Sequence, residues 1–208
     1  MGLFGKTPES VSIGRTLPPL AAPRASTSAI LGLVGAAAIY ISVISAPGVS
    51  GVLGAGLAVV MLAIAIIDGR RFIIPDWLNA AGIMLAIVYA GVREPEAMEQ
   101  AVVVATLRGL AVALVFFSLR YAYAKLRGRH GLGFGDVKLA FVAGTLLDWM
   151  TIPLAIELAA FAAITTCVLR QLILGQPISA TTRMPFGLFF APAIWICWVI
   201  EMRWFQLV

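Results

Sequence analysis

The sequence predicts an all-α fold, a polytopic transmembrane helical bundle of about seven spans. Of its 208 residues, 61% are hydrophobic and only 12% are charged, and its mean hydropathy is +0.99. A soluble domain does not need so much apolar material. The charged residues cluster between long apolar runs, as expected when each run crosses about 30 Å of hydrocarbon. The chain is therefore expected to be an integral membrane protein, with membrane lipid as a partner.

The apolar runs divide the chain in order. Residues 1–27 are mixed in composition and are expected to form a cytoplasmic or interfacial segment, whereas residues 28–208 form the transmembrane domain, with a core at about 52–200. Asp76, which follows Pro75, is predicted as the N-cap of the third span, and Asp136 as the N-cap of the fifth. The expected spans lie at about 28–44, 52–67, 77–92, 101–121, 136–148, 153–169 and 185–200.

The distribution of Lys and Arg predicts how these spans are oriented. If the N-terminus is cytoplasmic, Arg93 and Arg203 fall outside, and Arg108 falls within a span. The other twelve of the fifteen Lys and Arg then lie on the cytoplasmic side, which agrees with the positive-inside rule. These are Lys6, Arg15, Arg24, Arg70, Arg71, Arg120, Lys125, Arg127, Arg129, Lys138, Arg170 and Arg183. Their position beside apolar spans indicates topology signals and headgroup contacts, so nucleic acid is not an expected partner.

Two aspartates are predicted to lie at the same membrane face. Asp68 ends the second span and Asp136 follows the glycine-rich stretch GLGFGDVK, residues 131–138. The glycines leave the backbone free to adopt positive φ and to admit a second chain, so Gly133 and Gly135 are expected to serve access. Two neighbouring acids at the edge of hydrocarbon cannot both ionise easily. One can then take a proton from water while the other donates one, which suits peptide hydrolysis without a covalent intermediate.

A simpler interpretation is that each aspartate caps a helix or anchors an interface. Asp136 fits that interpretation well. Asp68 fits it less well, because it lies at the C-terminal end of its span, where the helix dipole disfavours an anion. A transporter component that relays protons or binds a cation through the same aspartates, and a non-catalytic membrane scaffold, are the alternative functions.

Three motifs resemble those of the type IV prepilin peptidases. Residues 68–79, DGRRFIIPDWLN, resemble the family's Asp-x6-Pro-[Asn/Asp] signature, and GFGDVK resembles its Gly-x-Gly-Asp-x-Lys signature. The stretch RMPFGLFFAPA, residues 183–193, resembles the Pro-Phe-Gly entry into the last span, with Pro185 and Gly187 at motif positions. Leu188 stands where many members have a second proline. The resemblance covers about residues 52–200.

The resemblance implies a membrane-embedded aspartyl endopeptidase with Asp68 and Asp136 as catalytic residues. Its substrate would be a type IV prepilin or pseudopilin whose short basic leader is removed at the cytoplasmic face of the bacterial inner membrane. The pilus assembly machinery is a further expected partner. Many members also carry a domain with Cys-x-x-Cys motifs and methylate the new N-terminus, but the cysteines of this chain, Cys167 and Cys197, form no such motif. The resemblance is therefore to the short, peptidase-only branch of Flp or Tad pili, with one extra N-terminal span in front of the usual six. The archaeal preflagellin peptidases are also short, so the substrate class stays open. The scaffold named above as an alternative would be one for pilus assembly.

The remaining polar residues carry secondary expectations. Lys138 is expected either to tune Asp136 or hold substrate, or else to reach the interface as an ordinary lysine. The single histidine, His130, cannot build a zinc site, so no metal and no cofactor is expected. Arg108 and Glu157 are predicted to pair between helices, because charges inside spans rarely stay unpaired. Tryptophans near span ends are predicted to lie at the interface: Trp149, Trp195, Trp198 and Trp204.

Overall fold

The structure, a computed structural model, describes residues 25–128, 131–174 and 185–204. The expected N-terminal segment lies almost wholly outside these ranges, as do His130 and Arg183. The described residues form α-helices and one short 3-10 helix and include no strand, which confirms the predicted fold class. The elements are α1 (Ala25–Ser45), α2 (Gly48–Arg71), α3 (Asp76–Arg93), η1 (Pro95–Ala97), α4 (Met98–Arg127), α5 (Phe134–Leu146), α6 (Thr151–Leu174) and α7 (Phe186–Trp204).

Five of these helices, α1, α2, α4, α6 and α7, are long and apolar enough to cross a membrane. Many of their large apolar side chains face outward, including Leu33 on α1, Leu107 on α4 and Phe161 on α6. The chain is thus a multi-pass membrane protein. Helix α5 differs, because its 13 residues span only about 20 Å. It is instead enclosed by other helices, and Leu139, Ala140, Val142 and Ala143 are fully buried.

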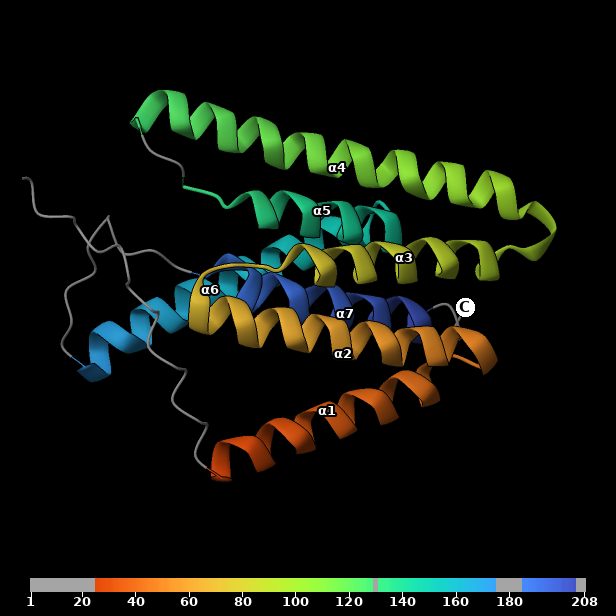
Figure 1. Cartoon of the computed structure of the whole chain (residues 1–208), viewed down its shortest axis with the longest axis horizontal. Coiled ribbons are helices and arrows are strands. Elements are labelled where there is room, and N and C mark those ends of the chain that lie inside the picture. Colours follow the sequence, from red (N-terminus) through yellow and green to blue (C-terminus); the bar gives the residue numbers. More distant parts are fainter. Residues whose placement is uncertain (1–24, 129–130, 175–184, 205–208) are drawn as a thin grey trace, which may run out of the picture.

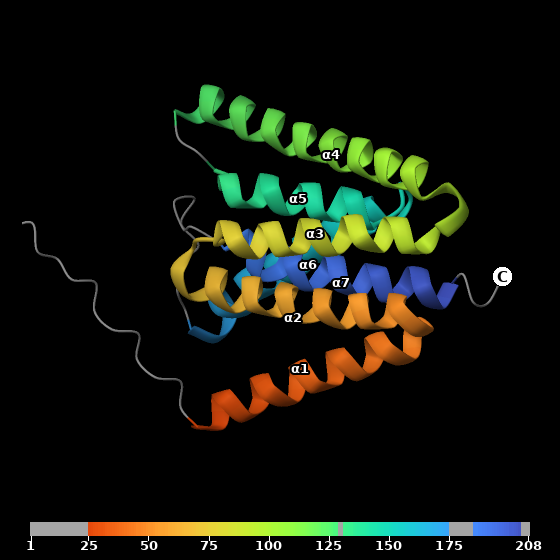
Figure 2. The ribbon, with the colours of Figure 1, turned by 45° about the vertical axis from the view of Figure 1, so that its right-hand side comes forward.

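The helices pack side by side, and the outermost are α1 and α4 (Figure 1). Helix α2 packs on α1, α3 and α7, whereas α5 packs on α3, α4 and α7. Figure 2 shows the same order from a second direction. Helices α2 and α4 end, and α3, α5 and α7 begin, at one end of the bundle, on the left of both views. Residues from the end of α2 and the starts of α3, α5 and α7 can therefore meet there.

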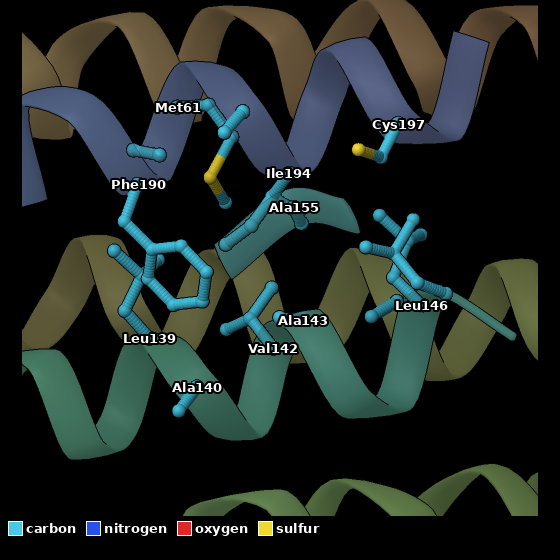
Figure 3. Packing of buried hydrophobic residues seen from close by; sticks show 14 of the residues in the cluster. Met61, Leu139, Ala140, Val142, Ala143, Leu146, Ala155, Phe190, Ile194 and Cys197 are labelled. Atoms are coloured by element: carbon cyan, nitrogen blue, oxygen red, sulfur yellow. The ribbon is translucent and has the colours of Figure 1, made fainter. Parts of the chain in front are cut away.

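The core lies where α2, α5 and α7 face one another. Figure 3 shows Met61 of α2, Val142 of α5, and Phe190 and Ile194 of α7 pointing into the same space. Their side chains are at most 1% exposed. The faces that meet include small residues, and at Gly54 an added Cβ would lie 1.9 Å from the ring of Trp198. Close packing of this kind fixes how far α5 and α7 can shift relative to α2.

A polar network joins α3, α4, α5 and α7 toward the other end of the bundle, away from the end where α3, α5 and α7 begin. Arg108 donates to the carbonyl of Gly144 at 2.7 Å and pairs with Asp148 at 3.0 Å. Arg93 pairs with the same carboxylate at 3.3 Å, and the backbone N–H of Asp148 donates to Glu201. The predicted pair of Arg108 with Glu157 is therefore wrong. Glu157 lies on the exposed side of α6, and which acid Arg108 meets depends on how the helices are rotated.

Two of the four tryptophans expected at the interface are in fact packed inside. Trp198 is fully buried and makes an edge contact with Tyr89, with ring centroids 5.9 Å apart. Trp195 donates from its indole nitrogen to the Ser42 hydroxyl at 2.9 Å, which joins α7 to α1. Trp149 and Trp204 are exposed, at 59% and 66%. Tryptophan near a span end does not by itself indicate an interfacial belt.

Candidate active site

Asp68 and Asp136 lie at the same end of the bundle, where α2 ends and α5 begins. Asp68 is in the last turn of α2 and Asp136 is in the first turn of α5. Their residues are only 5% and 8% exposed. Buried carboxylates need compensating donors, since burying an ion without partners costs on the order of several kcal/mol. The surrounding backbone supplies these donors.

Asp68 is held by the N-terminus of α7. The backbone N–H of Leu188 donates to Asp68 Oδ2 at 3.0 Å, and the N–H of Gly187 also donates to this carboxylate. The first N–H groups of a helix have no partner within the helix, and they carry the positive end of its dipole. The start of α7 thus offsets the unfavourable position of Asp68 at the end of its own helix.

Asp136 is held by its own helix start. The N–H of Gly133, the N-cap residue of α5, donates to Asp136 Oδ2 at 3.0 Å. Helix α5 begins at Phe134, so Asp136 is the third helical residue and the prediction that it is the N-cap is wrong. Its side chain reaches back to the N-cap N–H, which is the acidic half of a capping box. Asp136 therefore does cap α5, through Oδ2. This leaves Oδ1 for other partners.

The two carboxylates are close enough for the charge of Asp68 to act on Asp136. The guanidinium of Arg120 acts on Asp136 as well. Arg120 also donates to the carbonyl of Leu132, so α4 fixes the segment that leads into α5. The arrangement is two buried acids with one cation nearby. Two like charges at such a separation repel, and protonation of one carboxyl would relieve that repulsion.

Ile74 packs between the helix starts that carry the site. It is buried, and it lies in the connection between α2 and α3. An added Cβ on Gly135 would lie 2.9 Å from Ile74 Cβ, and one on Gly187 would lie 2.7 Å from Ile74 Cδ1. Glycine at 135 and 187 thus lets α5 and α7 close onto the same side chain. This packing brings Asp68 and Asp136 to one place.

These features are found in a chain that matches a known family. The model of the type IV leader peptidase family matches residues 55–168, which include both Asp68 and Asp136. The chain belongs to the type IV leader peptidase family. Helix α7, whose first N–H groups hold Asp68, lies beyond the matched residues.

Individual relatives of the family differ in how much of their length the chain covers. The prepilin leader peptidase/N-methyltransferase of Aeromonas hydrophila is 29% identical over 162 residues, 76% of this chain and 52% of that protein. The protein of the same name from Pseudomonas putida is 30% identical over 138 residues, 65% of this chain and 45% of its own length. Leader peptidase HopD of Escherichia coli is 29% identical over 127 residues, 61% of this chain and 78% of HopD. The chain thus spans about half the length of the leader peptidase/N-methyltransferases it matches, and no solved structure matches it.

Asp76 and Lys138, two residues of the stretches singled out in the sequence, contact each other. Lys138 Nζ lies 2.6 Å from Asp76 Oδ1, and the ammonium also lies 5.2 Å from the centre of the Phe134 ring. The N-cap position of α3 is occupied by Pro75, so the prediction of Asp76 as N-cap is wrong. An exposed pair of this kind stabilises by about 0–1 kcal/mol. Its geometric effect is to join the first residue of α3 to the second turn of α5 beside the site.

The glycines of the stretch 131–138 do not use the freedom to adopt positive φ. Gly133 has φ −71°, and among the described residues the glycines with positive φ are Gly48 and Gly128. The role of Gly133 and Gly135 in admitting substrate stays a prediction. Their observed neighbours give a packing reason for glycine, because Cβ atoms there would meet Asp136 and Ile74.

Sequence reasoning missed three contributors to this candidate site: the N–H of Leu188, the side chain of Ile74 and the guanidinium of Arg120. The Pro-Phe-Gly motif marked the start of α7 but gave no reason to pair it with Asp68. Proline at 188 would carry no N–H, so leucine there supplies a hydrogen bond that a second proline could not. Within the described residues no three His, Cys, Asp or Glu side chains are grouped to hold a metal ion.

Substitution of Gly187 by Ala tests the packing of the site. A Cβ there would lie 2.9 Å from Asp68 Oδ2 and 2.7 Å from Ile74 Cδ1, so the carboxylate must shift. Displacement of a reacting group by about 1 Å lowers rates by about 100-fold. We expect Gly187→Ala to lower precursor cleavage by about that factor, measured by gel shift, while circular dichroism keeps its helical signal. Gly56→Ala is the matched control, because its Cβ would meet Leu85 at an ordinary 3.5 Å; equal rates for both variants would contradict this packing role.

Proposed function

We propose that the chain is a membrane-embedded aspartyl endopeptidase that removes the short basic leader from Flp-like type IV prepilins. The observation that carries the proposal is the buried pair Asp68 and Asp136, each bonded to backbone N–H groups at adjoining helix ends. Membership of the type IV leader peptidase family supports the peptidase chemistry. The names of the relatives support a prepilin as the substrate class.

In the proposed reaction the two aspartates divide the work of acid and base. The ionised carboxylate takes a proton from a water molecule, whose oxygen then bonds to the scissile carbonyl carbon. The protonated carboxyl donates its proton to the carbonyl oxygen. When the C–N bond breaks, the carboxyl that took the proton from water gives it to the leaving amine, and the other carboxylate takes back a proton from a hydroxyl of the tetrahedral intermediate. The N–H groups of Leu188 and Gly133 orient the carboxyls and favour their ionised forms. Neither step needs a covalent enzyme intermediate or a cofactor.

We propose further that the site faces the cytoplasm of a bacterium, in its inner membrane. Basic residues gather at the end of the bundle that carries the site, which the positive-inside rule assigns to the cytoplasm. In the described residues these are Arg70, Arg71, Arg120, Lys125, Arg127, Lys138 and Arg170. The opposite end carries the acidic segment from Glu94 to Glu99. A precursor that keeps its apolar helix in the bilayer would present its leader at the basic end.

Single-cysteine labelling tests this orientation. Leu126 at the basic end is 83% exposed and Met150 at the opposite end is 91% exposed, so either accepts a reporter cysteine. In a background with Cys167 and Cys197 replaced by serine, a membrane-impermeant maleimide applied outside is expected to label Met150→Cys and not Leu126→Cys. Permeabilised membranes should allow both to react, which controls for accessibility. The reverse pattern in intact cells would place the site on the outer face.

Co-expression with an Flp-type prepilin tests the proposed reaction. Mass spectrometry is expected to find the prepilin shortened by its leader and without a methyl group on its new N-terminus. The expectation of no methyl transfer is supported by the cysteines of the chain, both within apolar helices and not in a Cys-x-x-Cys motif. A methylated product would overturn that part alone. A precursor left at full length would overturn the peptidase proposal and favour transport or scaffolding through the same aspartates.

A further inference from the structure

Asn79 is a buried amide in the second turn of α3, near the candidate active site. It is 1% exposed, and neither its side-chain nitrogen nor its oxygen has a hydrogen-bond partner among the described residues. An amide buried in this way costs about 1–3 kcal/mol unless something bonds to it. Buried polar side chains in folded proteins are generally satisfied by protein or by ordered water. A partner that forms hydrogen bonds with the amide would explain why this buried residue is polar.

The register of the helices places Asn79 below the two aspartates. Gly82, one turn further along the same face of α3, lies where a Cβ would be 3.3 Å from Met61 and 3.4 Å from Val142. Figure 3 shows Met61 and Val142 pointing toward each other from opposite sides of the core. Asn79 thus faces the seam between α2 and α5, the two helices that carry the carboxylates.

Counting residues gives the depth of the amide. From the level of Gly82 toward the site end, Asn79 is three residues away on α3, or about 4.5 Å at 1.5 Å per residue. By the same rise, Asp68 lies about 10 Å beyond Met61 on α2, and Asp136 about 9 Å beyond Val142 on α5. The amide of Asn79 is therefore about one helical turn deeper than the carboxyls and on the side between them.

We propose that Asn79 is a positioning residue that holds the attacking water against Asp68 and Asp136. This inference rests on the proposed peptidase function. A primary amide offers one acceptor oxygen and two N–H donors, and a buried water forms two to four hydrogen bonds. The amide and the two carboxyls supply such a set from three different helices. Water suits this depth better than a peptide group, because the amide lies below the carboxyls and is almost completely enclosed.

One N–H of the Asn79 amide donates a hydrogen bond to the water oxygen throughout the attack on the carbonyl carbon. When the carboxylate removes a proton from the water, the oxygen gains charge as it bonds to the carbonyl carbon, and an amide N–H directed at it stabilises that charge. The other carboxyl gives its proton to the carbonyl oxygen. Asn79 neither gains nor loses a proton, so it acts through the position of the water.

Steady-state kinetics of Asn79→Leu on a synthetic prepilin separates this role from a structural one. Leucine has a similar shape and needs no hydrogen bond, so the melting temperature is expected to stay the same or rise. The kcat is expected to fall by about 10-fold, the loss of one hydrogen bond to a reacting group, with KM nearly unchanged. Asn79→Thr, whose hydroxyl can donate and accept a hydrogen bond in place of the amide, is expected to have a higher kcat than Asn79→Leu. Thr145→Val, a buried polar residue at the other end of α5, is the matched control and keeps the wild-type kcat.

The possible outcomes separate the two proposals. A wild-type kcat in Asn79→Leu, or a rise in KM alone, overturns the role in holding water while the peptidase function stands. If Asn79→Leu lowers both kcat and the melting temperature, and Asn79→Thr has no higher kcat than Asn79→Leu, the role in holding water is overturned in favour of a packing role. Absence of cleavage by the wild-type chain overturns the proposed function together with this inference.

Discussion

Asp136→Asn and Asp68→Asn are each expected to lower leader removal by about 1000-fold or more. Proton transfer by a positioned side chain contributes about 10²–10⁴-fold, and here each aspartate serves as partner to the other. Asparagine keeps the shape of the side chain but can neither take a proton from water nor give one to a carbonyl oxygen. Its oxygen can still accept from Leu188 or Gly133, so the fold should persist. The rate is measured by gel shift in membranes with equal amounts of each variant.

Glu157→Gln is the matched control for these variants. Glu157 is also an acid within an apolar helix, but it lies on the exposed side of α6. The Glu157→Gln variant should therefore remove the leader from the prepilin at the wild-type rate. Near-normal processing by either asparagine variant would remove that aspartate from the proposed chemistry, whereas equal losses in all three variants would indicate a general need for acids in the membrane domain.

Gly109→Ala is expected to give a large loss of stability. A Cβ on Gly109 would lie 2.2 Å from Thr145 Oγ1 and 2.9 Å from the carbonyl of Phe141, so α4 must move away from α5. Overpacking of this kind costs about 1–3 kcal/mol, and here the obstacle includes backbone that cannot rotate aside. The same movement shifts α5 and with it Asp136, so cleavage should fall in parallel.

Thermal melting in detergent, followed by tryptophan fluorescence, measures this effect. Gly144→Ala should behave in the same way, because its Cβ would lie 2.8 Å from the Cα of Gly109. Gly32→Ala on α1 is the control, since no atom lies within 4 Å of its added Cβ. If Gly109→Ala has the same melting temperature as Gly32→Ala, then α4 and α5 do not cross at this contact.

The sequence predicted the helices and the common end of Asp68 and Asp136 because these depend on hydropathy and connectivity. Apolar runs mark spans, and antiparallel connections bring the end of one span beside the start of another. The exact caps were not predicted. Asp76 and Asp136 were each expected at the N-cap but lie one and three residues inside their helices, and local signals are weakest at boundaries.

The contacts between distant segments required the structure. The bond from Leu188 to Asp68 joins residues 120 positions apart, and a backbone N–H carries no sequence signal. Arg108 meets Asp148 rather than Glu157 because of helix rotation, which average hydropathy does not report. Ile74 looks like any apolar residue in a loop until α5 and α7 close onto it.

The most direct test of the central claim is cleavage of a synthetic Flp-type prepilin by the purified chain in proteoliposomes, followed by mass spectrometry. We expect the wild-type chain alone to release the intact leader, with no added cofactor. We also expect Asp68→Asn combined with Asp136→Asn to lose no more activity than either single change, because residues that act as a unit are not additive. An uncut precursor with the wild-type chain, or cleavage that persists in the double variant, would contradict the account.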